Sequence, residues 1–125
     1  MLRLAGERDK INVVFDQVGT PTYAADLANT ILSVIQVLEK QPGKFVPGIY
    51  HFSNEGVASW YDFAKAVFEI SEVKCTVSPV RSIEFPTPAK RPDFSVLDKS
   101  KIKNTFGIII PHWRESLKNC IRKLN

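Results

Sequence analysis

The chain has 125 residues, of which 44% are hydrophobic and 24% are charged, and these values are typical of one ordinary globular domain. Its net charge of +4 is mild, and we expect the basic residues on solvated helix faces; no nucleic-acid partner is expected, since such a surface gathers basic residues with exposed aromatic rings. The longest apolar runs are too short to cross a bilayer and no basic-then-apolar leader opens the chain, so we expect a cytoplasmic protein without membrane contact.

The first elements in chain order are a helix end, a strand and a long helix. Residues 1–8 (MLRLAGER) look like the last two turns of a helix, so the start is expected to be cut from a larger protein. A strand is predicted over residues 11–15, where β-branched side chains are frequent. Apolar residues at helical spacing then predict a helix over about 23–40.

The middle of the chain predicts a strand, a helix and a second strand. The apolar run 49–52 (IYHF) indicates a short buried strand. Ser59 and Asp62 have the spacing of a capping box, which predicts a helix over about 60–71. Residues 74–80 again have the character of a strand.

The last third combines a proline-rich segment with two helices. The prolines of residues 85–92 (FPTPAKRP) fix φ and remove N–H donors, so this segment is predicted to be a stiff, extended surface path that presents Arg91. Asp98 is predicted to cap a helix over 99–106, and a final amphipathic helix follows from Trp113. These elements predict a mixed α/β fold that is nearer to a small α+β lobe than to a repeating βαβ array.

Two features that resemble reactive sites have plainer interpretations. Cys75 and Cys120 lack CxxC spacing and companion histidines, so we expect free, mostly buried thiols and no zinc site. Tyr61 and Lys65 match the Y-x-x-x-K spacing of a catalytic pair, but the chain contains no glycine-rich nucleotide loop to accompany them. A partly packed Tyr61 and a solvated Lys65 are therefore favoured.

The residue types of a hydrolytic triad also occur close together in the sequence. His51, Ser53 and Asp62 supply a base, a hydroxyl and a carboxylate. No nucleophile elbow is present around the serine, so a core or hydrogen-bonding role is favoured for these side chains.

The loop over residues 16–22 is the best candidate for a ligand contact. It lies at the carboxyl end of a strand and beside the first turn of a helix, where backbone N–H groups suit an anionic or hydroxylated ligand. Gln17, Thr20 and Thr22 could contact a sugar or a nucleotide, although such residues also satisfy loop backbone. Arg91 suits a bidentate hold on a phosphate or a carboxylate, or alternatively a surface salt bridge.

Four stretches in the same order resemble one enzyme family. The first covers residues 14–28 (VFDQVGTPTYAADLA) and resembles the D-Q-x-G-x-P-T-x-x-x-D-L-A stretch of dTDP-4-dehydrorhamnose reductase, an extended short-chain dehydrogenase/reductase. Residues 48–53 (GIYHFS), 59–64 (SWYDFA) and 89–98 (AKRPDFSVLD) look like further stretches of that family's carboxyl-terminal half. The resemblance covers nearly the whole chain.

The resemblance implies a fold and a function. Residues 1–125 would be the C-terminal substrate-binding domain, with the NADPH-binding Rossmann domain and the catalytic residues outside this chain. The complete enzyme would reduce dTDP-4-dehydro-L-rhamnose to dTDP-L-rhamnose with NADPH, for cell-surface polysaccharide, and this chain alone would be inactive. The residues expected to contact the sugar nucleotide are Asp16, Gln17, Thr20, Pro21, Thr22 and Arg91.

Further expectations come only from the resemblance. Some members bind Mg²⁺ and form homodimers through this half, so both are carried over as expectations. The partners would be a dTDP-sugar substrate and the missing Rossmann domain. The alternative is a non-catalytic binding or regulatory module of the same family that acts through a protein partner.

Overall fold

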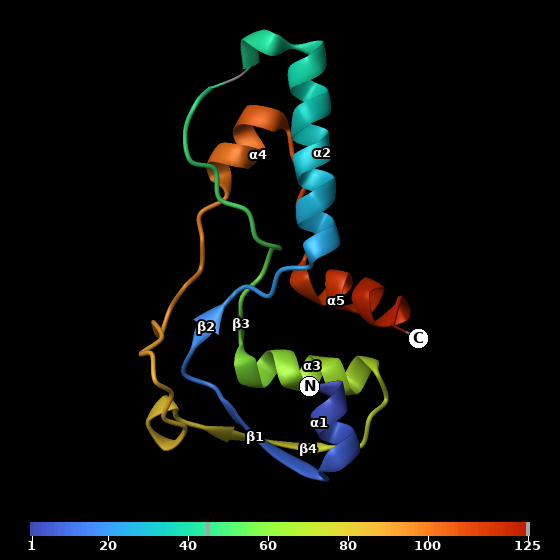
Figure 1. Ribbon diagram of the computed structural model, residues 1–125, viewed down its shortest axis with the longest axis vertical. Helices are drawn as coiled ribbons and strands as arrows, with labels where there is room; N and C mark the ends of the chain where they lie inside the picture. The colour runs from blue at the N-terminus through green and yellow to red at the C-terminus, as the bar shows by residue number, and fades with distance from the viewer. Residues whose placement is uncertain (45, 125) are drawn as a thin grey trace.

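A computed structural model of the chain describes residues 1–44 and 46–124, and these residues form five α-helices and two pairs of strands (Figure 1). The helices are α1 (Leu2–Glu7), α2 (Ala24–Lys40), α3 (Trp60–Ile70), α4 (Ser100–Phe106) and α5 (Trp113–Arg122). The strands are β1 (Lys10–Val14), β2 (Val18–Gly19), β3 (Ala58–Ser59) and β4 (Thr76–Val80). The expected mixed α/β class is confirmed.

Strands β1 and β4 form a parallel pair that carries one side of the main core. Ile11 lies opposite Val77, and Val13 lies opposite Pro79. Side chains alternate between the two faces of a strand, and Ile11, Val13 and Val77 are all buried. The predicted strands over residues 11–15 and 74–80 are therefore confirmed, with small shifts at their ends.

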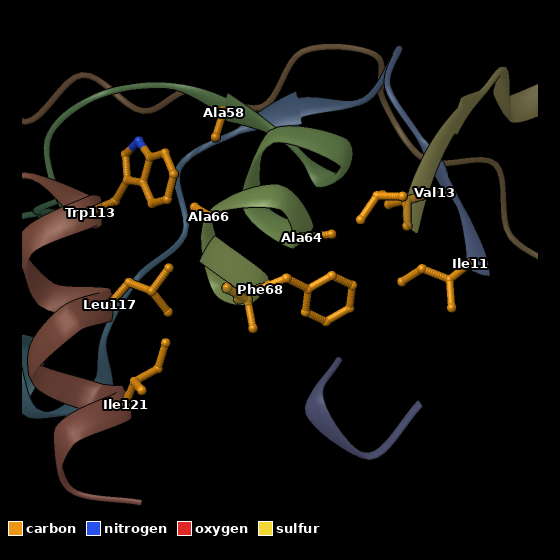
Figure 2. Close-up of a cluster of buried hydrophobic side chains, with 11 residues drawn as sticks. Ile11, Val13, Ala58, Ala64, Ala66, Phe68, Trp113, Leu117 and Ile121 are labelled. Carbon is orange, nitrogen blue, oxygen red and sulfur yellow. The ribbon is translucent and has the colours of Figure 1, made fainter. Parts of the chain in front are cut away.

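Helix α3 lies between this strand pair and α5. The predicted capping box is present: Ser59 Oγ accepts from the Asp62 N–H at 3.1 Å, and the Asp62 carboxylate accepts from the Ser59 N–H at 3.0 Å. Figure 2 shows the Phe68 ring of α3 extending toward the strands, whereas a row of apolar side chains on α5 faces the helix from the other side. The buried members of that row are Trp113, Leu117 and Ile121.

A second, smaller core lies where α4 packs on α2. Ile102 and Phe106 of α4 are buried there with Ile110, and Val34 and Leu38 of α2 pack against them. Another face of α2 stays open, because its apolar residues Leu27, Ile31 and Ile35 are 39–51% exposed. No helix within residues 1–44 and 46–124 has both the length and the apolar character that crossing a membrane requires.

Two expectations about local structure are wrong. Residues 49–52 do not form a buried strand: no segment of the described chain pairs with them, and Ile49 is 79% exposed. Helix α4 begins at Ser100, one residue later than predicted, with Lys99 as its N-cap, although the Asp98 carboxylate does accept from the Ser100 N–H at 2.8 Å. As predicted, Cys75 and Cys120 are free thiols and both are largely buried; Cys75 packs against the main core.

The proline-rich segment is exposed and irregular, as predicted, although it bends at residues 88–89 instead of staying extended. Residues 86–92 are exposed and lie outside every helix and strand. In Figure 1 the whole connection from β4 to α4 runs along one edge of the molecule. It therefore carries Arg91 over the surface next to β2.

Candidate functional site

The loop after β1 is held on both sides by extended backbone. On one side, β2 pairs with β3 in antiparallel fashion, with Val18 opposite Ser59. On the other side, the Val18 N–H donates to the Asp93 carbonyl at 2.8 Å, and the Ser95 N–H donates to the Val18 carbonyl at 2.8 Å. These two hydrogen bonds hold residues 93–95 beside the loop. The prolines within residues 86–92 restrict the backbone conformations of the chain that leads to them.

These three segments enclose an open cleft of about 350 Å³. Its walls come from the loop, from the start of α3 and from the end of the proline-rich segment. The lining residues are 17–21, 58–60, Phe63, 91–92 and Ser95. A concave site with apolar walls and a few polar groups is the usual form of a small-molecule site.

Four of the predicted contact residues line the cleft: Gln17, Thr20, Pro21 and Arg91. The Thr20 hydroxyl donates to the Gly56 carbonyl at 2.9 Å, so its oxygen can still accept a hydrogen bond from a ligand. The Gln17 amide donates to Ser82 Oγ at 2.9 Å, which fixes its orientation.

Asp16 and Thr22 do not line this cleft. The Asp16 carboxylate accepts from the Ser82 hydroxyl at 2.7 Å and from the Ser82 N–H at 2.9 Å, and these hydrogen bonds lower the pKa of Asp16. The exposed Thr22 hydroxyl donates to the Thr20 carbonyl at 3.3 Å. In this conformation both side chains support the loop, and their contact with substrate stays a prediction.

Arg91 has no ion pair with any carboxylate of the described residues. It is exposed and lies two positions before Asp93, whose carbonyl is bonded to β2. A guanidinium in such a place presents several N–H donors toward the cleft edge, in the planar arrangement that suits phosphate oxygens. Of the two roles considered for Arg91, the surface salt bridge is therefore not observed among the described residues.

Sequence reasoning missed the aromatic wall of the cleft. Trp60 is the first residue of α3 and is 44% exposed, and its ring meets Phe63 edge-on with the ring centroids 6.4 Å apart. An exposed aromatic ring in a cleft can pack against a flat or apolar portion of a ligand. The available signal was the position of Trp60 directly after the cap residue, which places its side chain at the helix end beside the loop.

A group of charged residues beneath the loop was also missed. The Glu55 carboxylate pairs with Lys103 at 2.9 Å and with Lys99 at 3.2 Å. The hydrogen bond from Lys103, followed by that from Lys99, holds the pKa of Glu55 below its usual value. Lys99 also donates to the Asn54 carbonyl at 3.1 Å. The two lysines therefore bind residues 54–55, next to Gly56, whose carbonyl accepts from Thr20 of the loop.

The other motifs form no site. Tyr61 packs partly against the main core and Lys65 is exposed, as predicted for an amphipathic helix. His51 is exposed and Ser53 is buried, whereas Asp62 is used in the capping box of α3. The hydrogen-bonding interpretation is therefore confirmed for Asp62.

The described residues of the chain include no group of three or more His, Cys, Asp or Glu side chains placed to hold a metal ion. The structure thus offers no support for the expected Mg²⁺. Carboxylates such as Glu55 and Asp16 are instead satisfied by lysines and by backbone or hydroxyl donors.

A concave, loop-lined cleft with a few polar groups on a mixed α/β domain is the form typical of small-molecule-binding domains. Comparison with known proteins makes the assignment specific. The family model described as the RmlD substrate binding domain matches residues 1–125. The chain belongs to this family.

Relatives agree with this assignment. The dTDP-4-dehydrorhamnose reductase of Aggregatibacter actinomycetemcomitans is 41% identical over 126 residues, which cover 95% of this chain and 42% of the relative. A crystal structure of a dTDP-4-dehydrorhamnose reductase from Clostridium acetobutylicum matches with a TM-score of 0.87 and 42% identity, over 98% of this chain and 41% of that one.

The reductase from Bacillus anthracis, solved in complex with NADP, matches with a TM-score of 0.87 and 36% identity, again over 98% of this chain and 41% of that one. The chain thus spans about 42% of the length of the relatives that it matches.

Proposed function

We propose that this chain is the sugar-nucleotide-binding domain of a dTDP-4-dehydrorhamnose reductase, which reduces dTDP-4-dehydro-L-rhamnose to dTDP-L-rhamnose with NADPH. The observation that carries the proposal is the cleft in which Gln17, Thr20 and Pro21 meet Trp60 and Arg91. Its support is the family membership of residues 1–125 and the names of the relatives. Neither the fold nor these relatives favour the alternative of a non-catalytic regulatory module.

Each wall of the cleft suits one portion of a sugar nucleotide. The Arg91 guanidinium would pair with the diphosphate, because a planar fork of donors fits phosphate oxygens. The exposed Trp60 ring would pack against a ring of the ligand. The Thr20 hydroxyl and the Gln17 side chain would hydrogen-bond to sugar hydroxyls. In this proposal the chain binds and orients the substrate and supplies no catalytic group.

The NADPH site would belong to the region of the enzyme that the relatives have beyond the matched residues. The relative from Bacillus anthracis was solved with NADP. In our proposal the exposed apolar face of α2, with Leu27, Ile31 and Ile35, packs against that region. Hydride transfer would need both regions, so we expect this chain alone to bind but not to reduce the substrate.

Calorimetric titration with dTDP and dTDP-rhamnose tests the proposal. We expect binding by the unchanged chain and a loss of about tenfold or more in Arg91→Ala, since a charged hydrogen-bond pair is worth about 1.5–3 kcal/mol. Lys90→Ala is the matched control, because Lys90 is an exposed neighbouring cation that does not line the cleft. No binding by the unchanged chain, or equal losses in both variants, would contradict the proposal.

A further inference from the structure

Asn54 is a fully buried amide at the junction of three segments of the chain. Its side chain is 0% exposed. Asn54 Oδ1 accepts from the Tyr23 N–H at 2.8 Å, and Asn54 Nδ2 donates to the Asp26 carboxylate at 2.6 Å. The same nitrogen lies 2.9 Å from Ser116 Oγ and 3.1 Å from the Pro111 carbonyl. Both polar atoms of this side chain are therefore engaged, as the cost of burying an amide requires.

These contacts provide a hydrogen-bond acceptor at the start of α2, which has none from its own N-cap side chain. The N-cap residue of α2 is Tyr23, whose side chain makes no capping hydrogen bond. The first N–H groups of a helix need acceptors, and Asn54 provides one from a distant segment of the sequence. Ser116 of α5 adds a hydrogen bond from its hydroxyl to Asp26 in the first turn of α2. In Figure 1, α2 begins beside the first turn of α5.

The segment that carries Asn54 also binds residues 19–20 of the cleft loop. The Thr20 hydroxyl donates to the Gly56 carbonyl at 2.9 Å, and Gly19 lies opposite Ala58 in the β2–β3 pair. Thr20 and Tyr23 are thus attached to the same segment on either side of Pro21. The position of this stretch of the cleft wall depends on both attachments.

The segment itself is fixed to the residues before α5. The Glu55 N–H donates to the Pro111 carbonyl at 2.9 Å, and the Trp113 N–H donates to the Glu55 carbonyl at 2.9 Å. Beside them, Gly56 has φ +86°, and a Cβ added there would collide with the His112 ring and lie 2.8 Å from Trp113 Cδ1. Asn54 therefore connects the loop to a segment that is hydrogen-bonded in turn to the residues just before α5.

We infer that Asn54 is a positioning residue for the sugar-nucleotide cleft: through Tyr23 and Asp26 it fixes the loop that contributes Thr20 and Pro21. This inference rests on the proposed function for the identity of the ligand. The placement of the loop by Asn54 does not depend on it, so the two can be tested separately.

The first test measures loop order without a ligand. Hydrogen–deuterium exchange of the peptide that covers residues 17–22 should be at least about fivefold faster in Asn54→Ala than in the unchanged chain, while exchange in the middle of α3 stays the same. The matched control is Ser53→Ala, since Ser53 is buried in the same segment but its hydroxyl makes only a 3.4 Å contact to the Asn54 carbonyl. Unchanged exchange of residues 17–22 in a folded Asn54→Ala would overturn the inference.

The second test measures how the dTDP affinity of Asn54→Asp changes with pH. A general loss of packing would not produce such a pH dependence. At about pH 8 two carboxylates would face each other at the Asp26 contact, so we expect dTDP to bind about tenfold more weakly than to the unchanged chain. A proton added to a pair of facing carboxylates restores a hydrogen-bond donor between them, so the loss of affinity should be smaller at about pH 5.5 than at about pH 8. The other charged or titratable groups facing this site are Lys99, Glu55 and His112.

The outcomes separate the two proposals. If the unchanged chain does not bind dTDP but loop exchange rises in Asn54→Ala, the positioning role stands and the proposed ligand is wrong. If Asn54→Ala does not fold, Asn54→Asp decides the matter through loop exchange and thermal unfolding at the two pH values. Loop exchange and dTDP affinity of Asn54→Asp that equal those of the unchanged chain at both pH values would refute the positioning role.

Discussion

Replacement of Ser59 by alanine should reveal how much the start of α3 contributes to stability. The Ser59 side chain is buried and makes two hydrogen bonds: it accepts from the Asp62 N–H at 3.1 Å and donates to the Asp62 carboxylate at 2.7 Å. Loss of a serine cap costs about 1 kcal/mol, within a range of roughly 0.5–2. The Asp62 carboxylate would keep its bond from the N–H of residue 59, so we expect a loss of about 1 kcal/mol in the free energy of unfolding.

Urea unfolding followed by circular dichroism measures this loss. With a slope of about 1.5 kcal/mol per molar urea for a domain of this size, the midpoint of Ser59→Ala should fall by about 0.7 M. Ser33→Ala is the matched control, because the Ser33 hydroxyl is exposed and bonds only to the Asn29 carbonyl within α2. That variant should change the free energy of unfolding by less than about 0.5 kcal/mol. Equal midpoints for the two variants would refute the role given to the capping box.

Two further changes test the support beneath the loop. Gly56→Ala should lower the free energy of unfolding by about 3 kcal/mol, because φ is +86° and the new Cβ would collide with the His112 ring; thermal unfolding measures it, and a loss below about 1 kcal/mol would contradict the close approach. Glu55→Gln removes a carboxylate whose pKa is lowered mainly by the hydrogen bond from Lys103 and then by Lys99. A lowered pKa stabilises the fold above the unfolded pKa, near 4.5, and this contribution disappears as pH falls through the folded pKa. Urea titrations should therefore find the wild type more stable than Glu55→Gln at about pH 7 but not at about pH 3, whereas a pH-independent difference would exclude this origin.

Local signals in the sequence were enough for most of the helices. The Ser59–Asp62 capping box fixes the start of α3 through atoms three residues apart, so a short window of sequence contains the whole cause. The prolines of residues 85–92 likewise exclude regular structure by their own geometry. Asp98 shows the limit of such signals, because its carboxylate accepts from the Ser100 N–H as a cap would, yet the helix begins one residue later than predicted, with Lys99 as its N-cap.

Strand 49–52 was predicted wrongly for a physical reason. A strand is completed by hydrogen bonds to a neighbour, and apolar composition alone cannot show where that neighbour lies. The described residues supply no neighbour, so the run stays unpaired, with Ile49 exposed.

Sequence patterns were sufficient to recognise the family motifs, the helices with local caps and, among the six proposed contact residues, the four that line the cleft: Gln17, Thr20, Pro21 and Arg91. Which polar residues face the cleft and which support it depends on the tertiary structure. Asp16 turns to Ser82 and Asn54 turns to Tyr23 and Asp26, because each buried or backbone polar group takes the partner that folding brings within hydrogen-bond distance. Those partners lie far away in the sequence, and no local pattern encodes their approach.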